Sequence, residues 1–384
     1  MNSSVNPLIV SLGLYRSSGG PVKTISIFRD ALKADLYCFV NDRQYRTEDF
    51  AVEGGHIIPS RSLPLFREMC IPARDSLAEL ENSAMDTPII SSHSFYRYHS
   101  IWTHQAFKRW KTPYWHVPHG ILDPYVTTYG VAMKKIFLKA GGESFLRDAA
   151  CTVFATKREW EKAESVFGKM NGEVVHWPVE LVDLGDRVSK RRNIREKLGI
   201  SEDARVLLYF GRVQKMKRPL ETIDAVASVK SDQLHLIMVG PSEGISATDL
   251  QQRAADTGLK HFHYVGAVYG RSKFDYLFAA DAYVSFSIRE NFNHTAAESL
   301  AAGLPVILSR GNDLGPEISE VGAGWYLEAD SQGAFKSALE SFLNHSDAGL
   351  AKCGKAGRDL VEQAFSYNHF KSRMQELMTQ YGRK

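Results

Sequence analysis

The segment that decides the fold reads SFSIRENFNHTAAESLAAGLPV and spans residues 285–306. An apolar run of strand length ends near Phe286, and the following Thr295–Ala302 has the composition of a helix. Asn293 or His294 is therefore predicted to begin a helix just beyond a strand end. Unpaired N–H groups at the start of such a helix bind anions, particularly phosphate. The segment therefore predicts a parallel α/β domain with a phosphate site at its strand ends.

Two glutamates flank this predicted phosphate site. Glu290 lies in the loop before the helix, and Glu298 lies in the early turns of the helix. Carboxylates repel phosphate, so we interpret both as acceptors for sugar hydroxyls on either side of it. The alternative is a solvated loop glutamate and a helix glutamate used in an ion pair.

The alternation of short apolar runs with longer helical stretches continues through both halves of the chain, which is typical of parallel sheets covered by helices. We therefore predict the α/β class, with two Rossmann-like, doubly wound domains facing a central cleft. The strands are predicted near Leu8–Leu12, Leu36–Val40, Pro88–Ser92, Tyr114–Val117, Cys151–Ala155, Arg205–Phe210, Leu234–Val239, His263–Val265, Ala282–Phe286 and Pro305–Leu308.

The domain boundary is placed where this pattern stops. Asp183–Arg192 is polar, charged and aperiodic, which is typical of a connector. We predict a first domain over 1–182 and a second over 193–364. The tail Tyr367–Tyr381 has helical spacing of apolar residues and is expected to pack that face on the protein.

Composition limits the classes of function. The chain has 384 residues, of which 44% are hydrophobic and 24% charged, as in soluble globular proteins. A net charge of +3 is too small to indicate nucleic acid as a partner. Four separated cysteines without a Cys-x-x-Cys pair suit a reducing cytosol. Neither a signal peptide nor a membrane-spanning run is expected.

A basic loop follows the first strand of the second half. The loop reads GRVQKMKR and places Arg212 and Lys217 at a strand end. Fixed cations there can bind a phosphate held at the strand ends. An ordinary basic surface loop is the alternative.

Two segments of the first half carry candidate residues. Gly19 and Gly20 follow the first strand, where glycines let backbone N–H groups approach a phosphate, although an ordinary turn explains them as well. The stretch TPYWHVPHGILDP over 112–124 ends a strand in His119-Gly. His116, inside the apolar strand, is interpreted as a satisfied core histidine.

The spacing of Glu290 and Glu298, with Phe292 between them and AAGLPV after them, resembles the signature of retaining family 4 glycosyltransferases, the glycosyl transferases group 1 with the GT-B fold. The resemblance implies that Glu290 contacts the donor sugar and Glu298 the nucleotide ribose. His119 matches a subgroup reading Pro-His-Gly-Met-Leu-Asp-Pro, whose histidine binds a hydroxyl of the transferred sugar. The implied nucleotide-sugar site comprises Gly19, Gly20, Arg212, Lys217, Phe292, Asn293, His294, Thr295 and Glu298.

The implied reaction moves a hexosyl unit from a UDP- or GDP-sugar to a hydroxyl of a glycan or lipid-linked saccharide, forming an α-glycosidic bond in polysaccharide or lipopolysaccharide assembly. The first domain would serve the acceptor, with the tail helix packed back on it, and the second would bind the nucleotide sugar. Because the chain contains no Asp-x-Asp pair, we expect no divalent metal and no other cofactor.

Two other functions stay open. One is a nucleotide-sugar epimerase of the same fold. The other is a non-catalytic nucleotide-sugar sensor, for which Asn291 and Asn293 are the hints, because they stand where the family often has glycine.

Cations with nearby aromatic residues make the first half locally basic. The protein is expected in the cytoplasm, and this mix would suit peripheral contact with an anionic inner membrane, although a solvated helical face explains it as well. The residues are Arg97, His99, Lys108, Arg109, Trp110, Lys111, Lys134, Lys135 and Lys139.

Overall fold

The computed structural model describes residues 5–15, 20–41, 52–62 and 70–383, and the chain divides into two compact units. The first unit runs to Trp177 and includes the tail from Asn368, and the second unit takes Pro178–Tyr367. The chain therefore passes from the first unit to the second between Trp177 and Pro178, before residue 182, where we predicted the first domain to end. In the described part of the chain, no helix combines the length and the apolar content that a bilayer crossing requires.

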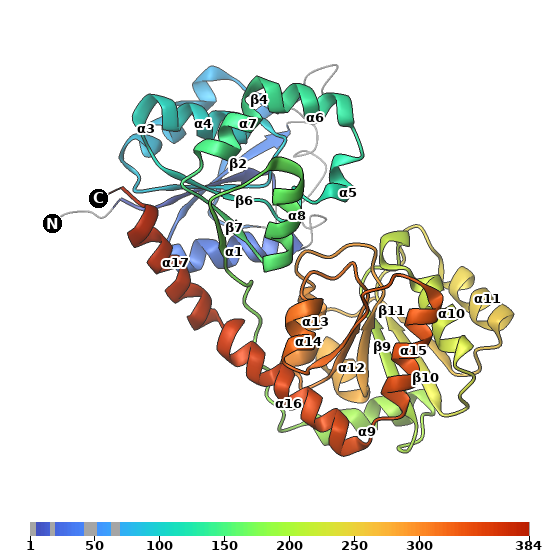
Figure 1. Ribbon diagram of the computed structural model, residues 1–384. Helices are drawn as coiled ribbons and strands as arrows, with labels where there is room; N and C mark the ends of the chain where they lie inside the picture. The colour runs from blue at the N-terminus through green and yellow to red at the C-terminus, as the bar shows by residue number, and fades with distance from the viewer. Residues whose placement is uncertain (1–4, 16–19, 42–51, 63–69, 384) are drawn as a thin grey trace. The chain divides into compact units, whose positions relative to one another are not determined.

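The first unit contains, among its described residues, a sheet in the order β4-β3-β2-β1-β5-β6-β7-β8. All neighbours pair in parallel except β3 and β4. Helices cover both faces (Figure 1). The strands are β1 (Leu8–Leu12), β2 (Asp35–Asn41), β3 (His56–Ser62), β4 (Cys70–Pro72), β5 (Ile90–His93), β6 (Tyr114–Val117), β7 (Cys151–Phe154) and β8 (Gly172–Val174). The α-helices are α1 (Gly20–Leu32), α3 (Ala78–Asp86), α4 (Tyr98–Trp110), α5 (Pro124–Thr127), α6 (Val131–Phe137), α7 (Glu143–Asp148), α8 (Lys157–Phe167) and α17 (Tyr367–Tyr381).

The second unit has a parallel sheet in the order β11-β10-β9-β12-β13-β14. When the strands are numbered within the unit, this is the Rossmann order 3-2-1-4-5-6. The chain adds strands on one side of β9 up to β11 and then on the other side from β12 on, so the switch point lies between β9 and β12. The strands are β9 (Arg205–Phe210), β10 (Leu234–Val239), β11 (Phe262–Gly266), β12 (Ala282–Ser285), β13 (Val306–Leu308) and β14 (Gly324–Tyr326). The helices are α9 (Arg187–Leu198), η4 (Lys215–Lys217), α10 (Pro219–Ser228), α11 (Ala247–Thr257), α12 (Lys273–Ala279), α13 (His294–Ala301), α14 (Gly315–Glu320), α15 (Gln332–Leu343) and α16 (Asp347–Ala364).

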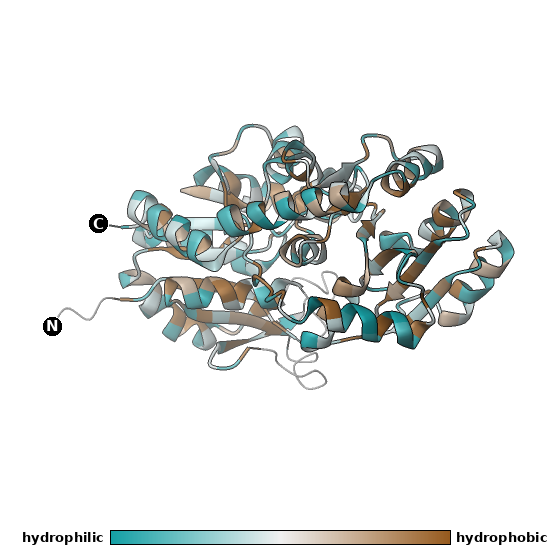
Figure 2. Ribbon diagram, turned by 90° about the horizontal axis from the view of Figure 1, so that it is seen from below, coloured by the Kyte–Doolittle hydropathy of each residue, from teal (hydrophilic) through white to brown (hydrophobic). Residues whose placement is uncertain are grey.

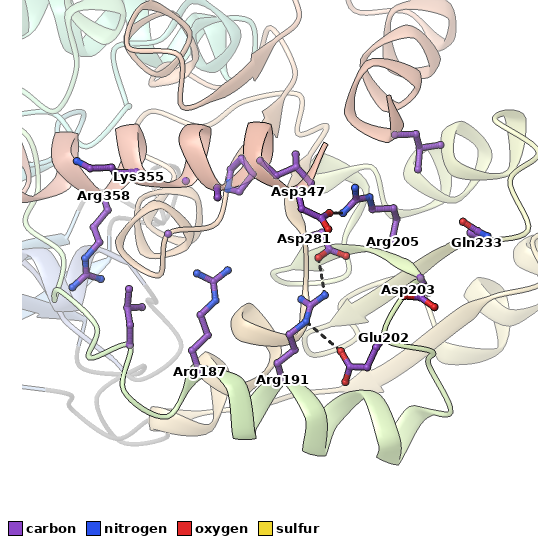
Figure 3. Close-up of a pocket in the computed structure, with 18 of the residues that line it drawn as sticks. Arg187, Arg191, Glu202, Asp203, Arg205, Gln233, Asp281, Asp347, Lys355 and Arg358 are labelled. Atoms are coloured by element: carbon purple, nitrogen blue, oxygen red, sulfur yellow. Dashed lines mark hydrogen bonds and ion pairs between the residues drawn. The ribbon is translucent and has the colours of Figure 1, made fainter. Parts of the chain in front are cut away.

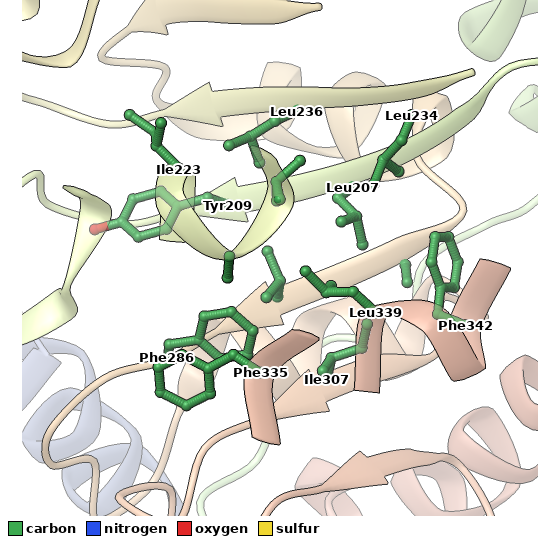
Figure 4. Close-up of a cluster of buried hydrophobic side chains, with 14 of the residues drawn as sticks. Leu207, Tyr209, Ile223, Leu234, Leu236, Phe286, Ile307, Phe335, Leu339 and Phe342 are labelled. Atoms are coloured by element: carbon green, nitrogen blue, oxygen red, sulfur yellow. The ribbon is translucent and has the colours of Figure 1, made fainter. Parts of the chain in front are cut away.

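The core of the second unit lies between its sheet and the covering helices (Figure 4). Most strand residues of the second unit are hydrophobic, whereas its helices carry both hydrophobic and polar residues (Figure 2). The ring of Phe286, just after β12, stacks on Phe335 of α15 at 4.0 Å between centroids. This packing fixes the chain where it leaves β12 and enters the loop that carries Glu290.

The tail helix α17 belongs to the first unit from Asn368 on. Its buried Phe370 packs edge-on against Phe28 of α1 at 5.0 Å and lies 6.4 Å from Trp177. Tyr381 also donates to Glu173 in the first unit at 3.1 Å. The apolar face expected from the sequence therefore covers α1.

The predicted connector Asp183–Arg192 is wrong in part, because α9 begins at Arg187. The helix has no apolar face and is held instead by two arginines. Arg195 is fully buried and donates to Asp281 and to backbone carbonyls, including that of Ala279. Arg191 donates to the other carboxylate oxygen of Asp281 at 2.9 Å. Hydrophobic periodicity cannot detect a helix that is anchored by ion pairs.

Candidate functional site

The candidate residues of the second unit lie where β9 and β12 end, on either side of the point where strand order reverses. Ligands of open α/β sheets bind at this position. The loop after β9 carries Lys217 and the loop after β12 carries Glu290. A backbone hydrogen bond from Ile288 N to Met216 O, at 2.9 Å, joins the two loops. They therefore form one surface.

Glu290 and Lys217 form an ion pair at the centre of this surface. The carboxylate side chain is 14% exposed and the ammonium side chain 22%, so both are largely withdrawn from water. The Glu290 backbone is fixed by Gly311, whose carbonyl accepts from Glu290 N at 2.8 Å. A Cβ at Gly311 would lie 2.2 Å from the carbonyl oxygen of Ile288, so only glycine allows this approach.

Helix α13 begins at His294 with Asn293 as its N-cap, as the sequence predicted. The Asn293 Oδ1 accepts from Ala296 N at 3.1 Å, and its Nδ2 donates to Asn312 Oδ1 at 2.8 Å. Asn293 and Asn312 are both buried. Buried Phe292 packs its ring against His294.

This amide pair fixes the start of α13, including Thr295 in its first turn. The first N–H groups of the helix therefore keep a set position at the strand ends, where they can bind an anion.

Glu298 lies inside α13, is 9% exposed and pairs with Lys273 of α12 at 2.7 Å. Lys273 and Asn312 could not be predicted from the sequence, because neither follows a strand in a recognisable spacing. The carboxylates of Glu290 and Glu298 are thus each held by a lysine from another element.

Arg212 is more exposed than predicted for a fixed cation. Its side chain is 57% exposed and pairs with Glu243, in the loop after β10, at 3.0 Å. The structure does not pair it with Glu290 or Glu298. Nearby Tyr209 donates to the Arg212 carbonyl at 2.8 Å, and burial raises the pKa of the Tyr209 phenol well above its ordinary value. This phenol therefore stays neutral.

In the first unit, His119 follows β6 in a left-handed conformation with φ of 52°. The next residue, Gly120, donates its N–H to the buried carboxylate of Glu159 at 2.6 Å, and Glu159 also accepts from Ala155 N at 2.8 Å. This carboxylate therefore joins the turn after β6 to the turn after β7. Such a conformation is uncommon for a residue with a Cβ and needs bracing of this kind.

The glycine pair is described only in part. Gly19 lies outside the described residues. Gly20 is the first residue of α1 and is exposed, and a Cβ there would meet no heavy atom within 4 Å. The surroundings described here thus leave room for a side chain at this position.

Two histidine interpretations need correction. His116 is fully buried in β6, as expected, but neither ring nitrogen makes a hydrogen bond among the described residues, although the Ser94 backbone lies close enough to influence its pKa. Burial lowers the pKa of His116 to about 3. His99 is also fully buried, and burial lowers its pKa to about 4. His99 therefore contributes no charge to a basic surface.

A separate pocket of about 800 Å³ lies at the amino ends of β9, β10 and β12, away from the site loops (Figure 3). Its charges largely satisfy one another, since Arg191 pairs with Asp281 and Glu202, and Arg205 pairs with Asp347. Among the residues that the structure describes, no three His, Cys, Asp or Glu side chains gather as metal ligands would.

Known proteins resemble this chain in sequence and in fold. Residues 190–360 match the model of the family described as glycosyl transferases group 1. D-inositol 3-phosphate glycosyltransferase of Geodermatophilus obscurus is 29% identical over 169 residues, which cover 41% of this chain and 37% of that protein. Alpha-monoglucosyldiacylglycerol synthase of Streptococcus pneumoniae is 27% identical over 237 residues, which cover 60% of this chain and 54% of that protein. The chain thus spans only about a third to a half of the length of these curated relatives.

The crystal structure of Anabaena HepE in complex with UDP matches with a TM-score of 0.75 at 15% identity, covering 98% of this chain and 100% of that one. This likeness, with the two parallel-sheet units, confirms the predicted GT-B fold.

Proposed function

Because residues 190–360 of this chain match the model of the glycosyl transferases group 1 family, we propose that the protein is a retaining glycosyltransferase. It moves a hexosyl unit from a nucleotide-diphosphate sugar to an acceptor hydroxyl and forms an α-glycosidic bond. The observation that carries this proposal is the Lys217–Glu290 pair beside the start of α13, at the switch point of the second sheet. The cation and the helix start suit the diphosphate of such a donor, and the carboxylate suits the hydroxyls of its sugar.

Different residues of the site bind the diphosphate, the sugar and the ribose of the donor. The first N–H groups of α13 and the Lys217 ammonium bind the diphosphate, whose charge grows as the glycosidic bond breaks. Glu290 accepts from hydroxyls of the donor sugar, and Glu298 accepts from the ribose. Arg212 turns from Glu243 to the diphosphate, which its exposed side chain permits. His119 binds a hydroxyl of the transferred sugar.

The ion pairs suggest how the site is kept ready for the donor. Each carboxylate proposed to receive hydroxyls is neutralised by a lysine, which lowers the cost of holding it largely away from water. When the donor arrives, Lys217 shares its charge with the diphosphate, and Glu290 exchanges part of its ion pair for sugar hydroxyls.

UDP-sugars are the first donors to examine, because HepE, which has the same fold, was solved with UDP; GDP-sugars are the second. The acceptor is proposed to be a glycan or a lipid-linked saccharide. The names of two relatives, an inositol-phosphate glycosyltransferase and a monoglucosyldiacylglycerol synthase, support a polar or lipid-linked hydroxyl acceptor. The protein is proposed to act in the cytoplasm and to need no divalent metal.

The test incubates the protein with UDP- and GDP-hexoses, with and without candidate acceptors, and follows free nucleotide and sugar products by mass spectrometry. A transferase releases UDP or GDP and adds mass to the acceptor. Products that remain attached to nucleotide would instead identify an epimerase. If the protein bound the donor but neither transferred nor hydrolysed it, the protein would be a sensor.

Glu290→Gln tests the site with the active donor. Its shape is kept, but the charge and the ion pair with Lys217 are lost, so we expect kcat to fall at least about 30-fold, roughly 2 kcal/mol of transition-state stabilisation. The matched control is Asp224→Asn, which removes a carboxylate from an ion pair with Arg253 elsewhere in the same unit. Equal kcat in both variants would contradict the assigned role of Glu290.

We further propose that α6 and the turn before it touch an anionic membrane. This α6 patch exposes Tyr129, Val131, Met133 and Ile136, together with Lys135 in the helix and Lys139 just after it. Apolar side chains interleaved with lysines fit the interface of an anionic bilayer. Co-sedimentation with phosphatidylglycerol vesicles should fall in Ile136→Glu and at high salt. Equal sedimentation with uncharged vesicles would contradict the proposal.

A further inference from the structure

Three side chains, two of them fully buried, form a hydrogen-bonded row at the carboxyl ends of β5 and β6. Ser91 Oγ lies 2.9 Å from His93 Nε2, and His93 Nδ1 lies 2.9 Å from His119 Nε2. Ser91 and His93 belong to β5 and are fully buried, whereas His119 follows the neighbouring strand β6. The first two residues thus connect the interior of the sheet to His119.

His93 is held in the neutral form. Burial lowers its pKa well below the ordinary value, and the nearby rings of His119, His99 and His116 lower it further. A neutral imidazole carries one proton, so one ring nitrogen donates and the other accepts. Which nitrogen of His93 carries the proton therefore depends on its two neighbours in the row.

Ser91 determines the direction of the row. Its buried hydroxyl has the His93 ring nitrogen as its side-chain partner, and a buried O–H without an acceptor costs free energy. If Ser91 donates to His93 Nε2, the proton of His93 lies on Nδ1 and is donated to His119 Nε2. His119, in its neutral form, then carries its own proton on Nδ1.

The rings and the strand end in this row are held in place by packing and by one further hydrogen bond. The Phe28 ring meets His93 edge-on at 4.9 Å, and Trp177 lies 5.9 Å from His119. His99 donates from Nε2 to the His93 carbonyl at 2.8 Å and fixes the strand end. Rotation of either ring would break these contacts.

We propose that Ser91 and His93 are positioning residues that hold His119 in the Nδ1–H tautomer. The proposed function rests on His119 meeting a sugar hydroxyl, and this inference deepens it by naming the atom: Nδ1–H donates to a hydroxyl oxygen, while Nε2 is occupied by His93. The chemistry selected is a neutral hydrogen-bond donor.

The test measures the tautomer directly. Two-bond ¹H–¹⁵N correlations of histidine-labelled protein distinguish Nδ1–H from Nε2–H rings, and the His119 signal is identified by its loss in His119→Ala. We expect Nδ1–H in the wild type. Ser91→Ala and His93→Phe should shift His119 toward Nε2–H, whereas His93→Asn should not, because its amide N–H replaces the Nδ1–H donor.

Ser92→Ala is the matched control, because Ser92 is equally buried in the same strand and its hydroxyl has no hydrogen-bond partner among the described residues. It should leave the tautomer unchanged. Circular dichroism checks that every variant is folded. If His93→Phe does not fold, Ser91→Ala alone tests the inference. An Nε2–H signal in the wild type, or no shift in Ser91→Ala, would overturn the inference.

Kinetics with the active donor separates this inference from the proposed function. Ser91→Ala and His93→Phe should lower kcat at least about tenfold with UDP affinity unchanged, and His93→Asn should restore most of it. A tautomer that shifts as expected without any change in kcat would refute the role of His119 in transfer while upholding the row.

Discussion

Removing the Asn293 side chain should loosen the start of α13 by an amount that its contacts determine. Loss of the N-cap to Ala296 N costs about 1 kcal/mol. Loss of the donor to buried Asn312 Oδ1 leaves that acceptor with only the Ser285 hydroxyl, at 3.4 Å, which costs about 1–3 kcal/mol. Asn293→Ala should therefore cost roughly 2–4 kcal/mol locally, or about 30-fold to a thousand-fold in opening equilibrium.

Hydrogen exchange followed by mass spectrometry on peptides covering α13 measures this opening. Asn293→Asp keeps the cap but loses the donated bonds and places a carboxylate oxygen against Asn312 Oδ1, so it should also speed exchange. Asn291→Ala, in the same loop, is the control and should stay near the wild type. If Asn293→Ala exchanged no faster than Asn291→Ala, the network would not hold the helix start.

Three further predictions concern stability, pH and metal. Arg195→Met should destabilise the second unit by about 3–5 kcal/mol in urea unfolding, because it removes a fully buried cation that donates to Asp281 and to four backbone carbonyls; a loss below 1 kcal/mol would contradict this. The pKa values of buried His99 and His116, about 4 and about 3, lie below the ordinary 6.5. Below pH 6.5 the unfolded chain therefore binds more protons than the folded protein. The stability that the two neutral histidines contribute is complete above pH 6.5 and falls as the pH is lowered toward 4. The urea midpoint should drop less over this pH range in His116→Phe than in the wild type. Sugar transfer should persist in excess EDTA while Lys217→Ala loses at least about 30-fold in kcat, and rescue by magnesium would refute the metal-free site.

The parts of the fold that could be predicted are those whose own short stretch of sequence has a clear hydrophobic pattern. Strands such as Tyr114–Val117 and Arg205–Phe210 are continuous apolar runs and were located to the residue. β3 contains Pro59 and Arg61, and β14 is only Gly324–Tyr326, so neither has a local pattern to detect. Their place is determined by neighbouring strands.

The residues of the candidate site also fall into those that could be predicted from local sequence and those that could not. The start of α13 was predictable because the strand, loop and helix are consecutive in sequence. Lys273 and Asn312 were not, because their partners come from other elements and only folding brings them together. His99 was misassigned because a histidine on a helix flanked by cations gives no sign of which face is buried.

The division of the chain also has a consequence for synthesis on the ribosome. The second unit is one continuous segment, whereas the first needs residues from both ends of the chain. Phe370, which covers Phe28 and Trp177, emerges after the whole second unit has been translated. Although nascent domains generally fold from the N-terminus onward, part of the aromatic core of the first unit here stays uncovered until the tail helix has been translated.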